Sequence, residues 1–139
     1  ISLYPFTHKN GKSLDLTMIQ GNVPQELKWQ PDQLNNIVEK YHQMTQAHWK
    51  SDLIIWPEGA IPALSTVAEP FLEALDKEAK SHQSSVILGI PVADGQHFYN
   101  GLLLLGKHEG RYFKRHLVPF GEYIPLEFLL EHLIQTLNI

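Results

Sequence analysis

The sequence predicts an α/β fold with a parallel sheet, and three observations indicate it. Two near-continuous apolar runs, LIIWP (53–57) and SSVILGIPV (84–92), are typical of strands covered on both faces. A segment with helical periodicity precedes each run, so strands and helices alternate along the chain. This alternation is typical of a parallel sheet with crossover helices. The 139 residues are enough for one domain with a core.

The first strand and the loop after it are expected within residues 14–30. Residues 14–23, LDLTMIQGNV, are rich in β-forming residues and end in a Gly-Asn turn signal. The loop 22–30 is expected to have little helical order. Its Trp29 either packs against its own domain or is an exposed aromatic residue.

Two amphipathic helices are expected to cross between the strands. The first begins at Pro31 and Asp32 and runs to about His48. Its apolar stripe comprises Leu34, Ile37, Val38, Tyr41 and Met44. The second begins near Pro70. Its inward residues are Phe71, Leu72, Leu75 and Ala79.

After residue 92 the strand–helix alternation stops. FYNGLLLLG (98–106) and GRYFKRHLVPF (110–120) flank a KHEG turn, which predicts a pair of hairpin strands added to the sheet. Pro125 begins a last helix with a continuous apolar face.

The composition excludes several classes of function. The net charge is −4 and the 11 Lys and Arg residues are scattered, so no basic face for nucleic acid is expected. With no cysteine, these residues form no disulfide and no thiolate metal site, and they hold no cysteine nucleophile. The eight His residues lack paired metal-ligand spacing, so we expect no metal and no cofactor. No run approaches the roughly 20 apolar residues of a membrane helix.

Glu58 is the first candidate catalytic residue. It directly follows a buried strand, and ligands of parallel sheets gather at the carboxyl ends of the strands. A carboxylate half removed from water there suits a general base, and the flanking Pro57 and Pro62 stiffen its loop. The alternative is a surface or helix-capping Glu in a turn.

Lys114 is the second candidate. Strand alternation places it on one face with Tyr112, His116 and Val118. It either extends its amino group to solvent or is held as a buried cation, which needs Glu58 or Glu122 as a carboxylate partner and could stabilise an oxyanion.

Two further residues have plain structural alternatives. Glu122 either supports Lys114 or complements the dipole of the following helix. Asn100 in FYNG is a candidate site residue or a turn residue.

Three segments in this order, LIIWPEGAIP, YNGLLLLG and YFKRHLVPFGEYIP, resemble the nitrilase or carbon-nitrogen hydrolase superfamily. The resemblance implies a Glu-Lys-Cys triad on an α-β-β-α sandwich, of which this chain forms a partial, truncated version. Glu58 matches the general base, Lys114 the oxyanion-stabilising lysine and Glu122 the supporting glutamate. Asn100 matches a structural Asn of the family and, with Trp29, is a candidate substrate-binding residue.

The family's nucleophilic Cys follows the FGE motif, and this sequence contains none. The resemblance therefore implies that the chain is inactive alone. Residues 1–13 are expected to be a lead-in segment, and residues 14–139 the first part of a nitrilase-like catalytic domain. Membrane spans are expected before residue 1 and after the domain.

Within the superfamily, MIQGNVPQELKWQP, WPEGAIP and KRHLVPFGEYIP resemble the apolipoprotein N-acyltransferase family. This implies transfer of an acyl group from a phospholipid to the N-terminal amino group of a bacterial apolipoprotein, through a thioester on a Cys outside this chain. It also implies an inner-membrane enzyme whose catalytic domain lies on the periplasmic face, with Trp29 near lipid or at the site entrance. Two alternatives stay open: a soluble amidase acting on a small amide, and a non-catalytic nitrilase-fold module.

Overall fold

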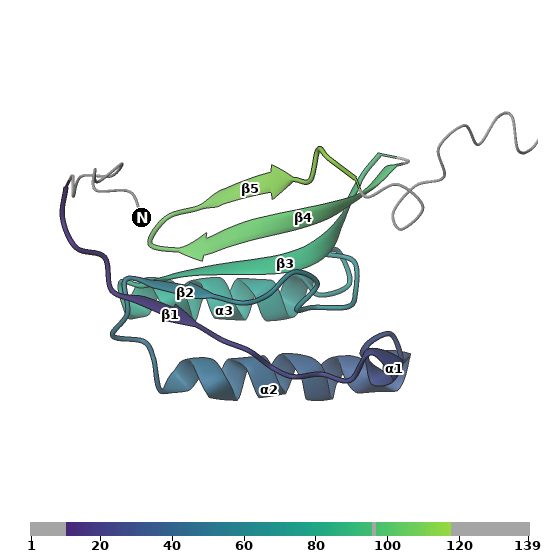
Figure 1. Cartoon of the computed structure of the whole chain (residues 1–139), viewed down its shortest axis with the longest axis horizontal. Coiled ribbons are helices and arrows are strands. Elements are labelled where there is room, and N and C mark those ends of the chain that lie inside the picture. The colour runs from purple at the N-terminus through teal and green to yellow at the C-terminus, as the bar shows by residue number, and fades with distance from the viewer. Residues whose placement is uncertain (1–10, 96, 118–139) are drawn as a thin grey trace, which may run out of the picture.

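A computed structural model describes residues 11–95 and 97–117 of the chain (Figure 1). Its elements are β1 (Leu16–Met18), α1 (Gln25–Lys28), the 3-10 turn η1 (Pro31–Gln33), α2 (Leu34–Gln46), β2 (Leu53–Ile55), α3 (Glu69–Ser81), β3 (Ser85–Asp94), β4 (His97–Gly106) and β5 (Gly110–Phe113). The helix expected from Pro125 lies outside the described residues.

The described strands form one five-stranded sheet in the order β1-β2-β3-β4-β5. β1, β2 and β3 are parallel, and β4 and β5 are added antiparallel. The predicted α/β fold, with crossover helices followed by a hairpin, is therefore confirmed.

Three of the strands are shorter than the sequence predicted, and β2 ends at Ile55 rather than at Pro57. β1 spans Leu16–Met18 rather than 14–23, because its parallel pairing with β2 covers only these residues. β5 ends at Phe113 rather than near residue 120, although the Lys114 backbone N–H still donates to the Asn100 carbonyl oxygen at 2.9 Å.

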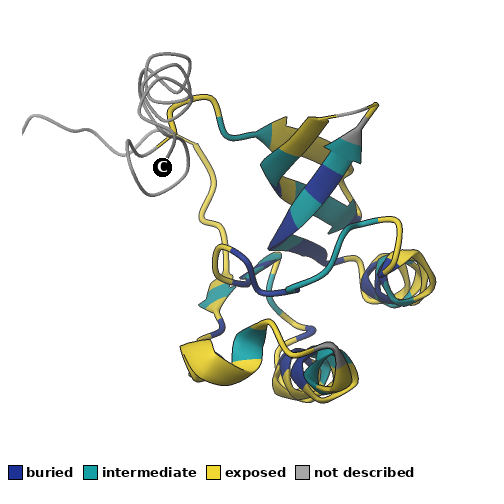
Figure 2. Ribbon diagram, turned by 90° about the vertical axis from the view of Figure 1, so that its right-hand side faces the viewer, coloured by how far each residue is buried: buried dark blue, intermediate teal, exposed yellow. Residues whose placement is uncertain are grey.

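The core lies between one face of the sheet and the helices α2 and α3, which Figure 2 shows end-on on the same side. Alternate strand residues Ile54, Val86, Leu88 and Ile90 are fully buried on this face. The predicted inward residues of α3 are confirmed: Leu72, Leu75 and Ala79 are buried, and the half-buried Phe71 packs against the core.

The helix predictions were wrong at two places. Residues 25–28, expected to be irregular, form α1, because Pro24 allows a helical turn in which Leu27 and Lys28 donate to its carbonyl oxygen. Met44, expected on the inward stripe of α2, is exposed. Thr45 is buried in its place, since the inward positions follow Ile37 and Tyr41 at intervals of four residues.

The opposite face of the sheet is apolar, and other described residues leave much of it exposed. Leu16, Met18, Leu102 and Tyr112 are exposed there. The expectation that strand 53–57 is covered on both faces is therefore not met within the described part, which forms one helical layer and one sheet. No helix in that part is long and apolar enough to cross a membrane.

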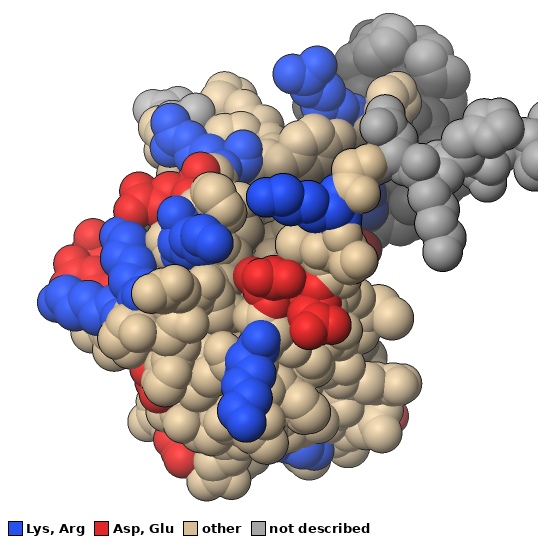
Figure 3. All heavy atoms as spheres, turned by 90° about the vertical axis from the view of Figure 1, so that its left-hand side faces the viewer, with Lys and Arg blue, Asp and Glu red and all other residues tan. Residues whose placement is uncertain are grey.

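Asp76 of α3 links this helix to the end of β4 by a hydrogen bond. Asp76 accepts hydrogen bonds from the Gly106 backbone N–H at 2.8 Å and from Lys80 at 2.8 Å. Burial alone would raise the pKa of Asp76, but these donors hold it below its ordinary value. Figure 3 shows that acidic and basic side chains are intermixed on the face it presents.

Trp56 anchors the end of β2 in the core. Its ring stacks on Tyr41 with centroids 5.1 Å apart, and its indole N–H donates to the Thr45 hydroxyl at 3.0 Å. Thr45 in turn donates to the Tyr41 carbonyl oxygen at 2.9 Å. This buried network holds the residue that immediately precedes Pro57 and Glu58.

Replacing Thr45 with Val should lower the free energy of unfolding by about 1–3 kcal/mol, because the variant leaves the buried Trp56 N–H without an acceptor. Urea unfolding followed by tryptophan fluorescence measures the change. Thr45→Ser keeps the hydroxyl and serves as the control. Equal stability of the Val and Ser variants would contradict the assigned hydrogen bond.

Candidate active site

Glu58 lies in a tight turn at the carboxyl end of β2. The Ala60 N–H donates to the Pro57 carbonyl oxygen at 3.2 Å, and Gly59 has a positive φ of 58°. Positive φ favours glycine, which explains its place directly after Glu58. Beyond the turn, the buried Ile61 donates from its N–H to the Gly89 carbonyl oxygen at 3.2 Å, so the loop is attached to β3.

The loop approaches β3 so closely that only glycine fits at residue 89. A Cβ added to Gly89 would lie 2.6 Å from the Glu58 Cα and 2.5 Å from the Gly59 nitrogen. The missing side chain lets the loop lie directly on the sheet. Gly89 thereby determines how closely the Glu58 backbone approaches β3.

The structure brings Glu58 together with Lys114, its predicted partner, and with Asn100, which the sequence singled out for another role. Its Oε1 accepts one hydrogen bond from Asn100 Nδ2 at 2.9 Å and another from Lys114 Nζ at 3.2 Å. Lys114 therefore forms an ion pair rather than only extending to solvent. The side chain of Lys114 is 29% exposed, whereas that of Glu58 is 63% exposed.

The exposure of Glu58 differs from the expectation of a half-buried carboxylate. Apart from its hydrogen bonds with Asn100 and Lys114, the carboxylate is left largely exposed by the described residues. Asn100 and Lys114 reach it from β4 and from the residue after β5, because pairing in the hairpin places the two residues side by side.

Glu58 forms part of the wall of two cavities. One has a volume of about 180 Å³ and is also lined by Asn100, Leu102, Tyr112 and Lys114. This confirms that Tyr112 and Lys114 share a face of the sheet. The cavity joins the carboxylate and the cation to an apolar wall.

The second cavity, of about 220 Å³, lies on the other side of the Glu58 loop. Its lining includes Gly21, Lys28 and Tyr41. Burial raises the pKa of Tyr41 above its ordinary value, although a hydrogen bond with the Gly21 backbone opposes the rise. Tyr41 is therefore a neutral hydroxyl near neutral pH.

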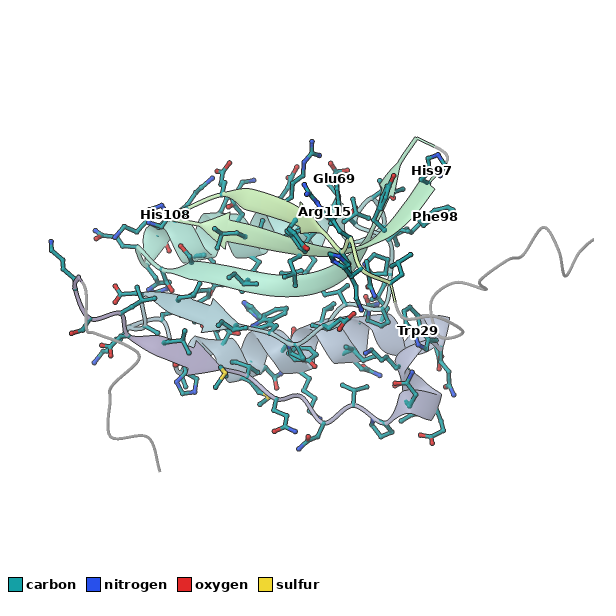
Figure 4. The ribbon with its side chains drawn as sticks, turned by 45° about the horizontal axis from the view of Figure 1, so that its top comes forward. Trp29, Glu69, His97, Phe98, His108 and Arg115 are labelled. Carbon is teal, nitrogen blue, oxygen red and sulfur yellow. The ribbon has the colours of Figure 1, made fainter. Side chains whose placement is uncertain are left out.

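Of the other predicted site residues, Trp29 does not join this cluster. Trp29 is 57% exposed and lines neither cavity at Glu58. Figure 4 shows it beside α1, at the same end of the molecule as Phe98 and away from His108. Glu122 lies outside the described residues. Within the described residues, His, Asp and Glu side chains form no group of three that could hold a metal ion.

Sequence reasoning missed Gly89 and Lys28. Gly89 interrupts an apolar run, and a glycine inside a strand is a known signal of close backbone approach. Lys28 gave no signal, because its place beside the Glu58 turn depends on how α1 folds against β2.

The Glu58 carboxylate is held in place by two hydrogen-bond donors, one of them the cation of Lys114, and a carboxylate held in this way can accept a proton. Residues 16–138 match the Carbon-nitrogen hydrolase family, and the chain belongs to that family. The chain is also similar to apolipoprotein N-acyltransferases. It is 48% identical over 137 residues to that of Methylococcus capsulatus, covering 96% of this chain and 27% of the relative. With that of Coxiella burnetii the identity is 43%, over 88% of this chain and 26% of the relative.

The chain therefore spans about a quarter of the length of these curated relatives. Solved structures share its fold at lower identity. XC1258 from Xanthomonas campestris, a CN-hydrolase superfamily protein, matches with a TM-score of 0.59 and 21% identity, over 86% of this chain and 44% of that chain. An N-terminal amidase matches with a TM-score of 0.53 and 21% identity, over 76% of this chain and 28% of that chain.

Proposed function

We propose that this chain is the first part of the catalytic domain of an apolipoprotein N-acyltransferase, with residues 1–13 as a lead-in and residues 14–139 as the domain segment. The 48% identity to the Methylococcus capsulatus enzyme supports this activity over an amidase. The hydrogen bonds from Lys114 and Asn100 to Glu58 are the observation that carries the catalytic assignment. The complete protein is then an inner-membrane enzyme with this domain on the periplasmic face.

In the first half-reaction, Glu58 accepts the thiol proton of a Cys supplied from outside this chain. The thiolate sulfur attacks the ester carbonyl carbon of a phospholipid, and the ammonium of Lys114 stabilises the oxyanion that forms. The carbon–oxygen ester bond then breaks. Glu58 returns the proton to the departing lysophospholipid oxygen, and a thioester remains.

In the second half-reaction, the α-amino group of the apolipoprotein attacks the thioester carbonyl. Glu58 accepts a proton from the attacking nitrogen, and the cysteine sulfur leaves and regains a proton. Asn100 is a positioning residue that holds Oε1 of Glu58, and Glu122 supports Lys114 or Glu58. Trp29 lies near lipid or at the entrance of the site.

The test is acyl transfer by the complete protein that carries this chain. It is supplied with a phospholipid bearing a labelled acyl chain and with a lipid-modified peptide whose N-terminal amino group is free. We expect a labelled peptide amide, detected by mass spectrometry, and none with an N-acetylated peptide. Release of free fatty acid without peptide acylation would show that water is the acyl acceptor and would contradict the proposal. Hydrolysis of a small amide without peptide acylation would support the amidase alternative, and a complete protein that is inactive on both the phospholipid and the amide would support the non-catalytic alternative.

Replacing Gly89 with Ala should lower the transfer rate about 10- to 100-fold, because the added Cβ displaces the Glu58 loop from the sheet. The measurement is the initial rate of peptide acylation.

Gly110→Ala is the matched control. A Cβ at Gly110 meets only Leu104, at ordinary contact distances of 3.8 and 3.9 Å, so this variant should keep the wild-type rate. Equal rates for both variants would contradict the role assigned to Gly89.

A further inference from the structure

Lys28 is a cation beside the Glu58 turn that the proposed chemistry does not use. It is the last residue of α1 and is half-buried. A Cβ added to Gly59 would lie 3.1 Å from its Nζ. The ammonium of Lys28 therefore lies directly over the backbone of the residue that follows Glu58.

The charge of Lys28 is not neutralised by another described residue. Lys77, Lys80 and Lys114 form ion pairs with carboxylates, whereas within residues 11–95 and 97–117 the amino group of Lys28 forms neither an ion pair nor a hydrogen bond. A half-buried cation without a partner is electrostatically suited to bind an anion. Lys28 also lines the cavity of about 220 Å³ beside Glu58, where an anion could reach its amino group.

The two cavities at Glu58 differ in chemistry. The cavity with Lys28 has polar groups in its wall, including the neutral Tyr41, and Glu58 is its other charged residue. The cavity with Lys114 has the apolar wall of Leu102 and Tyr112. A substrate whose reacting carbonyl lies at Glu58 therefore meets an apolar surface on one side, where Lys114 is paired with Glu58, and the cation of Lys28 on the other.

We propose that Lys28 binds the phosphate of the phospholipid acyl donor, with the acyl chain directed toward Leu102 and Tyr112. This assignment depends on the proposed acyltransferase function. A phospholipid ester joins an apolar chain to an anionic group, which matches the two sides of the Glu58 loop. The charge of Lys28 also offsets the repulsion between the phosphate and the Glu58 carboxylate.

The test compares two acyl donors in the complete protein: phosphatidylglycerol, and p-nitrophenyl palmitate, which has no phosphate. Lys28→Gln should raise KM for phosphatidylglycerol about 10- to 100-fold, as expected for the loss of one charge-assisted hydrogen bond. Its kinetics with p-nitrophenyl palmitate should stay within about two-fold of wild type, because only the phosphate contact is removed. Lys28→Arg keeps the charge and should retain most of the affinity. The exposed Lys77→Gln is the matched control and should behave as wild type.

An unchanged KM for phosphatidylglycerol in Lys28→Gln would overturn the proposal while leaving the acyltransferase function intact. An equal loss with both donors would also overturn it, because Lys28 would then only support the Gly59 turn. Wild-type protein that uses no phospholipid donor would overturn the proposed function and this assignment together.

Discussion

Glu58→Gln should reduce acyl transfer by the complete protein about 10²- to 10⁴-fold, because the variant removes the proposed general base of both half-reactions. The substitution preserves the shape of the side chain. Its Oε1 can still accept from Asn100 and Lys114, so the geometry of the cluster is kept while the proton acceptor is lost. Steady-state peptide acylation at saturating phospholipid measures the effect as kcat.

Glu73→Gln is the control for this variant. Glu73 is an exposed residue of α3 whose only ion pair among the described residues is a long one with Lys77, at 3.9 Å. We expect no change in its rate. Near-normal turnover of Glu58→Gln would remove Glu58 from the mechanism.

Lys114→Met should reduce kcat about 10²- to 10³-fold, comparable to the loss of one oxyanion-stabilising donor. Met keeps the length and apolar stem of Lys but has no charge. Because the stabilisation acts on the transition state, the fall should appear in kcat rather than in KM. Rates measured over a range of phospholipid concentrations separate the two parameters.

Arg115→Gln provides the neighbouring control. Arg115 is exposed and lines neither cavity at Glu58, so its loss should leave kcat unchanged. A fall confined to KM in Lys114→Met would indicate substrate binding rather than oxyanion stabilisation.

The order of the elements could be predicted from sequence because it depends on local periodicity. The apolar runs of β2 and β3 and the apolar stripes of α2 and α3 are visible in the sequence because these residues pack together in one hydrophobic core. Their ends were less predictable. The length of β1 depends on how far β2 runs beside it, and Met44 is exposed because the helix turns Thr45 inward to the Trp56 indole.

Part of the site was predictable for the same reason. A carboxylate at the end of a buried strand and a lysine on an alternating strand are both local patterns. In the structure, the Nζ of Lys114 lies 3.2 Å from the Oε1 of Glu58. The contact between Gly89 and the Glu58 loop depends on the spacing of two chain segments, which no local pattern encodes. Lys28 depends in the same way on the docking of α1.

The most direct measurement is the mass of the acyl-enzyme. The complete protein is incubated with phospholipid and no peptide acceptor, and intact mass spectrometry then follows the protein. The proposed mechanism predicts a wild-type species heavier by one acyl group, held on a cysteine as a hydroxylamine-sensitive thioester, and almost none in Glu58→Gln over the same time. Acyl-enzyme formation at the wild-type rate in Glu58→Gln would contradict the account.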